Sequence, residues 1–135
     1  VLMPVYNEQA GLEAILRRVH AVPVDKEIVV VDDCSTDGTA AILERVDLPD
    51  VKVFRHSVNQ GKGAAIRTAI VAAQGDAIII QDADLEYSPE EYPQLLAPIL
   101  SGDFAIVYGV RDLSGQRFAL HAYTNHLLRS RIVHL

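Results

Sequence analysis

Residues 77–86 read Ala77-Ile78-Ile79-Ile80-Gln81-Asp82-Ala83-Asp84-Leu85-Glu86. Three consecutive isoleucines are typical of a strand that is buried on both faces, as in a parallel sheet covered by helices. The apolar run ends at two aspartates separated by one residue, and Glu86 continues the alternation. Because side chains alternate along an extended chain, we expect the carboxylates of Asp82, Asp84 and Glu86 to project to the same side.

Carboxylates that are held close together repel one another. The repulsion is roughly 4 kcal/mol for two charges about 4 Å apart at an effective dielectric near 20, and a bound cation would offset it. Hard divalent cations prefer oxygen ligands, and Mg²⁺ often shares them with substrate phosphates. We therefore predict a site for Mg²⁺ or Mn²⁺ at Asp82, Asp84 and Glu86. The alternative is that these acids only face water at the end of a strand.

The composition is that of a globular domain. The chain has 135 residues, half of them hydrophobic, and a formal net charge of −6. These values predict a single domain over residues 1–135 with a sizeable core. The negative charge argues against a non-specific nucleic-acid binder, which needs a basic face. The lone Cys34 excludes an internal disulfide and a cysteine-based metal site, and it favours a cytoplasmic location.

Strand and helix patterns alternate along the chain. Short apolar runs predict strands at 1–3, 27–31, 51–55, 77–80 and 104–108. Apolar residues at helical spacing predict four helices: one that ends before Pro23, one capped by Ser35, Thr36 or Asp37, one over 64–73, and one from Pro89 to Leu100 with Pro98 as a candidate break. Residues 117–135 predict a basic amphipathic helix, which either packs against the core or a partner helix or lies on a membrane surface.

This alternation favours an α/β fold with a mostly parallel sheet flanked by helices on both faces. In such sheets, ligands bind beyond the carboxyl ends of the strands. The polar motifs fall at those ends: Tyr6-Asn7-Glu8, Asp32-Asp33, Asp82-Ala83-Asp84 and Gly109-Val110-Arg111. Four polar loops at one edge of the sheet predict a binding site there.

Several of these motifs also have a purely structural interpretation. Asp32 and Asp33 either accept hydrogen bonds from a nucleobase or ribose, or merely begin the next helix. Lys62, between two glycines, either reaches a phosphate or lies at a flexible helix start, and the spacing of the glycines excludes a P-loop. Arg111 either pairs with a pyrophosphate or is a surface arginine. The five histidines form no metal-ligand pattern and are interpreted as surface or acceptor-side residues.

Five motifs follow one another in a recognisable order: Val1-Leu2-Met3-Pro4-Val5-Tyr6-Asn7-Glu8, Val30-Val31-Asp32-Asp33-Cys34-Ser35-Thr36-Asp37-Gly38-Thr39, Asn59-Gln60-Gly61-Lys62-Gly63, Asp82-Ala83-Asp84-Leu85-Glu86 and Tyr108-Gly109-Val110-Arg111. In order and spacing they resemble family 2 glycosyltransferases of the GT-A (Rossmann-like) fold. The closest branch is that of the dolichol-phosphate mannosyltransferases and polyprenyl-phosphate glycosyltransferases. The resemblance spans nearly the whole chain, and the ordered set is far more specific than any one motif.

The resemblance implies an inverting, metal-dependent glycosyltransferase with a GDP- or UDP-sugar as donor and polyprenyl or dolichyl phosphate as acceptor. Asp82 and Asp84 match the D-x-D metal ligands and are the predicted catalytic residues, and Glu86 stands where this branch often has a glutamine ligand. The predicted nucleotide-sugar contacts are Lys62 and the positions that match the family's contacts, namely Pro4, Tyr6, Glu8, Val31, Asp33, Asp82, Ala83, Asp84 and Arg111.

The sequence departs from the family pattern in two places. Val110 replaces the serine that usually precedes the arginine. The chain also ends before the segment in which the family carries a Thr-Asp pair, further acceptor contacts and, in many members, membrane helices. Arg117, His121 and Asn125 match only the start of the acceptor side. We therefore expect a fragment of a longer protein that is located at the cytoplasmic face of a membrane.

Two other functions fit the same residues. A nucleotidyltransferase also combines an α/β sheet with acid-bound Mg²⁺, but it releases pyrophosphate where a glycosyltransferase of this type releases a nucleoside diphosphate. A nucleotide-binding fragment without catalysis is the other alternative, because the acceptor part of the family pattern does not occur in this chain. The sequence identifies neither the base nor the sugar.

Overall fold

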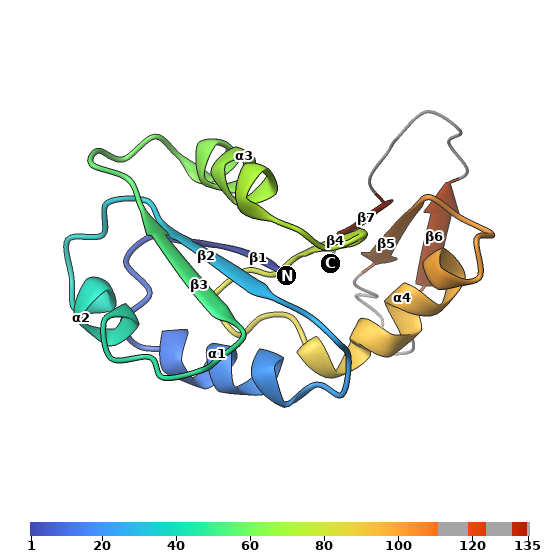
Figure 1. Cartoon of the computed structure of the whole chain (residues 1–135), viewed down its shortest axis with the longest axis horizontal. Coiled ribbons are helices and arrows are strands. Elements are labelled where there is room, and N and C mark those ends of the chain that lie inside the picture. Colours follow the sequence, from blue (N-terminus) through green and yellow to red (C-terminus); the bar gives the residue numbers. More distant parts are fainter. Residues whose placement is uncertain (111–118, 124–130, 135) are drawn as a thin grey trace.

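The structure is a computed structural model, and it describes residues 1–110, 119–123 and 131–134. One seven-stranded sheet runs through this part of the chain in the order β3-β2-β1-β4-β7-β5-β6 (Figure 1). Neighbouring strands are parallel except β5 and β6, so the predicted mostly parallel sheet is confirmed. The strands are β1 (Leu2–Val5), β2 (Ile28–Asp32), β3 (Val51–Arg55), β4 (Ala77–Ile80), β5 (Ile106–Val110), β6 (Ala119–Tyr123) and β7 (Arg131–His134).

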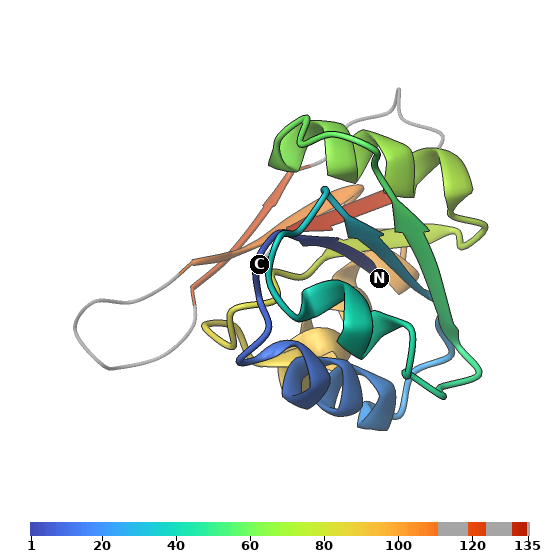
Figure 2. The same ribbon diagram turned by 90° about the vertical axis from the view of Figure 1, so that its left-hand side faces the viewer.

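Helices cover both faces of the sheet, as the sequence predicted (Figures 1 and 2). One face carries α3 (Lys62–Ala72), and the other carries α1 (Leu12–Ala21), α2 (Thr39–Leu43), the 3₁₀-helix η1 (Pro89–Glu91) and α4 (Tyr92–Leu100). Pro98 lies inside α4 without ending it, and α3 begins at Lys62 instead of Ala64. In the part of the chain that the structure describes, no helix has the length and apolar character needed to cross a membrane.

The central strands are buried on both faces, which explains their continuous apolar runs. On one face, Leu2 of β1 and Val31 of β2 pack beneath Ala65 and Ala69 of α3. The small alanine side chains let the helix lie close to the sheet. On the other face, the strands pack against the apolar side of α1, formed by Leu12, Ile15, Leu16 and Val19. The strands are therefore held firmly, and so are the points where the loops leave them.

The helix predicted over residues 117–135 is wrong for the residues that the structure describes, because the chain forms β6 and β7 there. β7 lies between β4 and β5 and pairs with both, with Ile132 opposite Ile78 of β4. This pairing outweighs the local helical spacing, since β-branched residues suit a strand at least as well as a helix. Arg117 and Asn125 lie outside the described residues.

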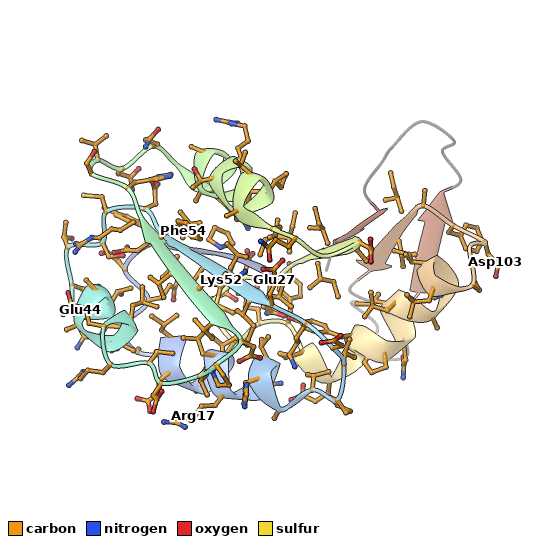
Figure 3. The ribbon with its side chains drawn as sticks, viewed as in Figure 1. Arg17, Glu27, Glu44, Lys52, Phe54 and Asp103 are labelled. Atoms are coloured by element: carbon orange, nitrogen blue, oxygen red, sulfur yellow. The ribbon has the colours of Figure 1, made fainter. Side chains whose placement is uncertain are left out.

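Glu27 joins the amino end of β2 to β3 and to the end of α3. Its carboxylate pairs with Lys52 Nζ at 2.8 Å and accepts hydrogen bonds from the backbone N–H groups of Gln74 and Gly75. Figure 3 shows Glu27 and Lys52 side by side. Phe54, also labelled there, is partly exposed on β3, which forms one edge of the described sheet.

A buried hydrogen bond fixes the end of β4 against α4. The hydroxyl of Tyr92 donates to Gln81 Oε1 at 2.7 Å, and Gln81 Nε2 donates to the carbonyl oxygen of Asp82 at 2.9 Å. Both side chains are almost fully buried. Burial raises the pKa of the Tyr92 phenol, so it remains a donor. This bond therefore holds the backbone at the start of Asp82-Ala83-Asp84.

Tyr92→Phe leaves Gln81 Oε1 buried without its donor. We expect the free energy of unfolding to fall by about 1–3 kcal/mol, as measured by urea denaturation. Tyr6→Phe is the matched control, because Tyr6 is 47% exposed and an exposed substitution changes stability by no more than about 0.5 kcal/mol. Equal losses in the two variants would contradict a special contribution from the buried bond.

Candidate functional site

Parallel pairing brings three polar loops to one edge of the sheet. β1 pairs in parallel with both β2 and β4, so the loops that follow these strands begin on the same side. Each loop contains one non-glycine residue with positive φ: Asn7 at 55°, Cys34 at 63° and Leu85 at 63°. Such backbone conformations cost energy and persist only where the surrounding structure enforces them. The loops are thus held in a defined geometry.

Side chains that follow β2 hold the loop that follows β1. Ser35 Oγ accepts the N–H of Asn7 at 2.9 Å, and Thr39 Oγ1 accepts the N–H of Glu8 at 2.9 Å. In return, Asn7 Oδ1 accepts the N–H of Thr36 at 2.8 Å. The polar residues after β2 therefore brace the neighbouring loop and fix the position of Glu8.

The prediction that Ser35, Thr36 or Asp37 caps the following helix is confirmed only in part. Gly38 holds the N-cap position of α2, but the carboxylate of Asp37, one residue earlier, accepts the N–H of Thr39, the first helical residue, at 2.9 Å. The N–H of Gly38 donates to Gln9 Oε1 at 2.8 Å, and a Cβ at this position would lie 2.6 Å from Gln9 Cδ. A side chain at this position would therefore require the exposed side chain of Gln9 to shift.

The three loops and the start of α3 enclose a pocket of about 410 Å³. Small-molecule sites typically measure about 300–1,000 Å³, so the pocket is large enough for a ligand. It is lined by Pro4, Val5, Tyr6, Glu8, Asp33, Asn59, Gly61, Lys62, Ala65, Asp82, Ala83 and Asp84. The structure thus brings together all the predicted nucleotide-sugar contacts except Val31 and Arg111.

Three predicted site residues are not part of this lining. The side chain of Val31 is fully buried beneath α3. Glu86 is exposed, and its N–H donates to Asp84 Oδ1 at 3.1 Å. Arg111 lies outside the described residues. The roles of these three residues stay predictions.

Acidic groups gather at the pocket. Burial raises the pKa of Glu8, and the charges of Asp84, Asp37 and Asp82 raise it further. Lys62 offsets part of this negative charge, because its Nζ lies 2.7 Å from Asp82 Oδ2. The pocket therefore pairs the ammonium group of Lys62 with the carboxylate of Asp82.

The three-carboxylate metal site that the sequence predicted is not formed by the described residues. Within them, no group of three or more Asp, Glu, His or Cys side chains is placed to hold a metal. Asp82 and Asp84 nevertheless line the same pocket, and Mg²⁺ usually binds through one or two carboxylates together with substrate phosphates. The donor set fits a cation that is shared with a phosphate ligand, and it does not fit a cation held by the protein alone.

Asp33 accepts several hydrogen bonds although it is almost fully buried. The N–H groups of Gln60 and Gly61 donate to its carboxylate at 2.9 and 2.6 Å, and His56 Nδ1 lies 2.6 Å from Oδ1. Burial raises the pKa of Asp33, but the hydrogen bonds from Gln60, His56 and Gly61 outweigh burial and lower the pKa overall. Asp33 is therefore ionised at neutral pH.

Sequence reasoning missed His56, which it interpreted as a surface or acceptor-side residue. Its side chain is only 9% exposed and lies between Asp33 and Thr68. In the pairing of β2 with β3, Asp32 is opposite Arg55, so the next residues on the two chains are neighbours. A polar residue directly after a strand was the available signal, but only the strand register reveals its partner.

The sheet order, the helices on both faces and the pocket at the carboxyl edge define an α/β domain of the GT-A class. The same fold occurs in a crystal structure of S. aureus TarS 1–349 in complex with UDP, with a TM-score of 0.71 and 26% identity. That match covers 86% of this chain and 36% of the TarS chain. The family model described as "Glycosyl transferase family 2" matches residues 1–132, and the chain belongs to this family.

The chain is similar to several curated relatives that are named undecaprenyl-phosphate 4-deoxy-4-formamido-L-arabinose transferase. The protein from Pseudomonas fluorescens (strain Pf0-1) is 40% identical over 136 residues, which cover 95% of this chain and 39% of the relative. The protein from Aeromonas hydrophila subsp. hydrophila is 39% identical over 112 residues, which cover 76% of this chain and 33% of the relative. The chain thus spans less than two fifths of the length of these relatives.

The lowered pKa of Asp33 makes stability depend on pH. A carboxyl group whose pKa is lower in the folded chain than in the unfolded chain stabilises the fold above its unfolded pKa. This contribution is lost as the pH falls through the folded pKa. We therefore expect the wild type to exceed Asp33→Asn in free energy of unfolding by more at about pH 5 than at about pH 3. The difference should shrink as the pH falls below 3.8, the ordinary value for this group.

Urea denaturation of the two proteins between about pH 5 and about pH 3 measures this difference at each pH. The comparison of one variant with the wild type cancels the titration of every other group that the substitution leaves unchanged. A difference that is the same at all these pH values would contradict the shift assigned to Asp33.

Proposed function

We propose that the residues lining the pocket bind the nucleoside-diphosphate sugar of a family 2 glycosyltransferase. We further propose that the complete protein transfers the sugar to a polyprenyl phosphate. One observation carries the proposal: a single pocket at the carboxyl edge of the sheet combines Asp33, Lys62 and the pair Asp82 and Asp84. Ligands of open α/β sheets bind at this edge. The pocket therefore offers a hydrogen-bond acceptor suited to a nucleobase and charged groups suited to a diphosphate.

The proposed roles follow from the chemistry of each group. We assign Asp33 and Tyr6 to the base and ribose, because an ionised carboxylate accepts N–H or hydroxyl donors and an aromatic ring offers a surface for stacking. We assign Lys62 to the diphosphate, because an ammonium group forms charge-assisted hydrogen bonds with phosphate oxygens. Lys62 already lies at the D-x-D motif through its pair with Asp82.

Asp82 and Asp84 are the proposed ligands of Mg²⁺ or Mn²⁺. When bound, the cation would act as a Lewis acid that offsets the negative charge developing on the departing diphosphate. Glu8, whose pKa is raised by burial and by Asp84, Asp37 and Asp82, would then lie beside a positive charge. The acidic lining is thereby explained as a feature of ligand binding.

The proposed reaction is an inverting group transfer. An oxygen of the acceptor phosphate forms a bond to the anomeric carbon, while the bond from that carbon to the diphosphate oxygen breaks on the opposite side. A nucleoside diphosphate leaves with the electron pair. Because a phosphate monoester has a second pKa of about 6, the acceptor is already anionic near neutral pH. The protein therefore needs to orient it and does not need a general base.

The acceptor and the location rest on the relatives. Their name contains undecaprenyl phosphate, which supports a polyprenyl phosphate as the acceptor of the complete protein. Since such a lipid resides in a bilayer, we place the proposed reaction at the cytoplasmic face of a membrane. UDP is the first nucleotide to test, because the TarS structure is in complex with it, and GDP is the alternative.

Turnover by the complete protein tests the proposed function. With Mn²⁺, undecaprenyl phosphate and a panel of UDP- and GDP-sugars, we expect one donor to yield a nucleoside diphosphate and a lipid-linked sugar. The same reactions without the lipid phosphate are the control and should yield neither product. Release of pyrophosphate would indicate a nucleotidyltransferase instead, and no turnover with any donor would reject the proposal.

Asp84→Ala removes one of the two carboxylates proposed to hold the cation. We expect Mn²⁺-dependent binding of UDP or GDP, followed by isothermal titration calorimetry, to be abolished. Asp103→Ala is the matched control, because Asp103 is an exposed carboxylate after α4 that does not line the pocket (Figure 3). Unchanged affinity in Asp84→Ala would remove the metal-site hypothesis.

A further inference from the structure

His56 connects two elements beside the pocket without lining the pocket itself. Its Nδ1 lies 2.6 Å from Asp33 Oδ1 after β2, and its Nε2 lies 2.9 Å from Thr68 Oγ1 on α3. We infer that His56 is a positioning residue, which orients Asp33 and through it fixes the loop that carries Lys62 into the pocket. The inference rests on the proposed function, because it gives His56 a part in nucleotide binding.

The imidazole ring is held in one orientation. An ionised carboxylate can only accept hydrogen bonds, so Nδ1 carries the proton shared with Asp33. Nε2 accepts the hydroxyl proton of Thr68 when the ring is neutral, and it donates to the hydroxyl oxygen when the ring is charged. Thr68 satisfies Nε2 in either state, and a rotation of the ring would break both bonds.

Asp33 can accept a ligand N–H at the position of one shared contact. Its two oxygens offer about four acceptor positions. The N–H of Gln60 is shared between them at 2.9 and 3.1 Å, the N–H of Gly61 donates to Oδ2 at 2.6 Å, and His56 donates to Oδ1. Each oxygen thus receives two contacts, and the Gln60 N–H takes part in both pairs. Asp33 lines the pocket, so a nucleobase N–H can replace the longer contact of Gln60 with Oδ2, while Gln60 keeps its bond to Oδ1 and the bonds from Gly61 and His56 remain.

The carboxylate of Asp33 also fixes the start of α3, whose first residue is Lys62. Gly61 donates its N–H to that carboxylate, directly precedes the helix and has a φ of 86°. A residue with a side chain rarely adopts this conformation, so the bend between Asp33 and the helix depends on the glycine. Lys62 follows at once and reaches Asp82 with its Nζ at 2.7 Å. The effect of His56 thus passes through Asp33 and Gly61 to Lys62.

Stability alone does not account for this arrangement. Desolvation of a buried pair of this kind offsets much of its attraction, so such a pair is weak support for the fold. What the pair does provide is an ionised carboxylate that is fixed in place beside a binding pocket. A fixed group loses less conformational entropy when a ligand binds, and affinity rises accordingly.

The test compares variants of the complete protein. Hydrogen–deuterium exchange of the segment 57–63 reports the loop, and calorimetry with UDP or GDP and Mn²⁺ reports the pocket. In His56→Phe, which keeps an aromatic ring but no donor, we expect exchange of the segment to be about 10-fold faster and nucleotide affinity to be about 10-fold weaker. In His56→Asn, whose amide can donate near the position of Nδ1, we expect most of both effects to be reversed.

Two further variants make the outcome decisive. Thr68→Val removes the bond to Nε2 at nearly constant shape, so it should accelerate exchange of the same segment even if His56→Phe fails to fold. His20→Gln is the matched control, because His20 forms a surface pair with Asp50 at 2.7 Å and should change neither measurement. Exchange that matches the wild type in folded His56→Phe or in Thr68→Val would overturn the inference. Absence of nucleotide binding in the wild type would instead reject the proposed function, and the exchange data would still decide the role of His56.

Discussion

A buried charge at the end of β2 constrains the whole edge of the sheet. Asp33 is 2% exposed, and an ionised carboxylate in such a position must be matched by donors. Those donors come from the loop after β3 and from its last turn before α3, so three elements that are distant in sequence become interdependent. The loop cannot move without leaving the charge unsatisfied, and neutralisation of the charge would weaken the bonds that hold the loop.

The buried strands and the helices packed on them hold the loops in this arrangement. β1 and β2 are buried on both faces, and the alanines of α3 let that helix lie close to them. A rigid layer of this kind can enforce unfavourable backbone conformations, which explains how Asn7, Cys34 and Leu85 are kept at positive φ in the three loops. The loops are therefore organised before any ligand arrives, as a binding site requires.

The sequence was most informative where a local pattern decides the structure. The isoleucines of β4 predicted a buried strand, and the polar residues after β1, β2 and β4 correctly predicted a shared edge, because parallel connectivity follows from the alternation of elements. The predictions failed where distant pairing decides. Residues 119–123 and 131–134 are strands because they pair with other strands. The role of His56 was not predicted, because its proximity to Asp33 depends on the register between β2 and β3.

The contact between Lys62 and Asp82 affects how donor affinity should depend on ionic strength. In the free chain the ammonium group neutralises the carboxylate, so the pocket carries its own counter-ion. Binding of the proposed donor together with its cation is then an exchange of partners: Lys62 turns to a phosphate, and Asp82 turns to the metal. Few charges are newly neutralised in such an exchange. Donor affinity should accordingly respond to ionic strength more weakly than the charge of a diphosphate alone would suggest.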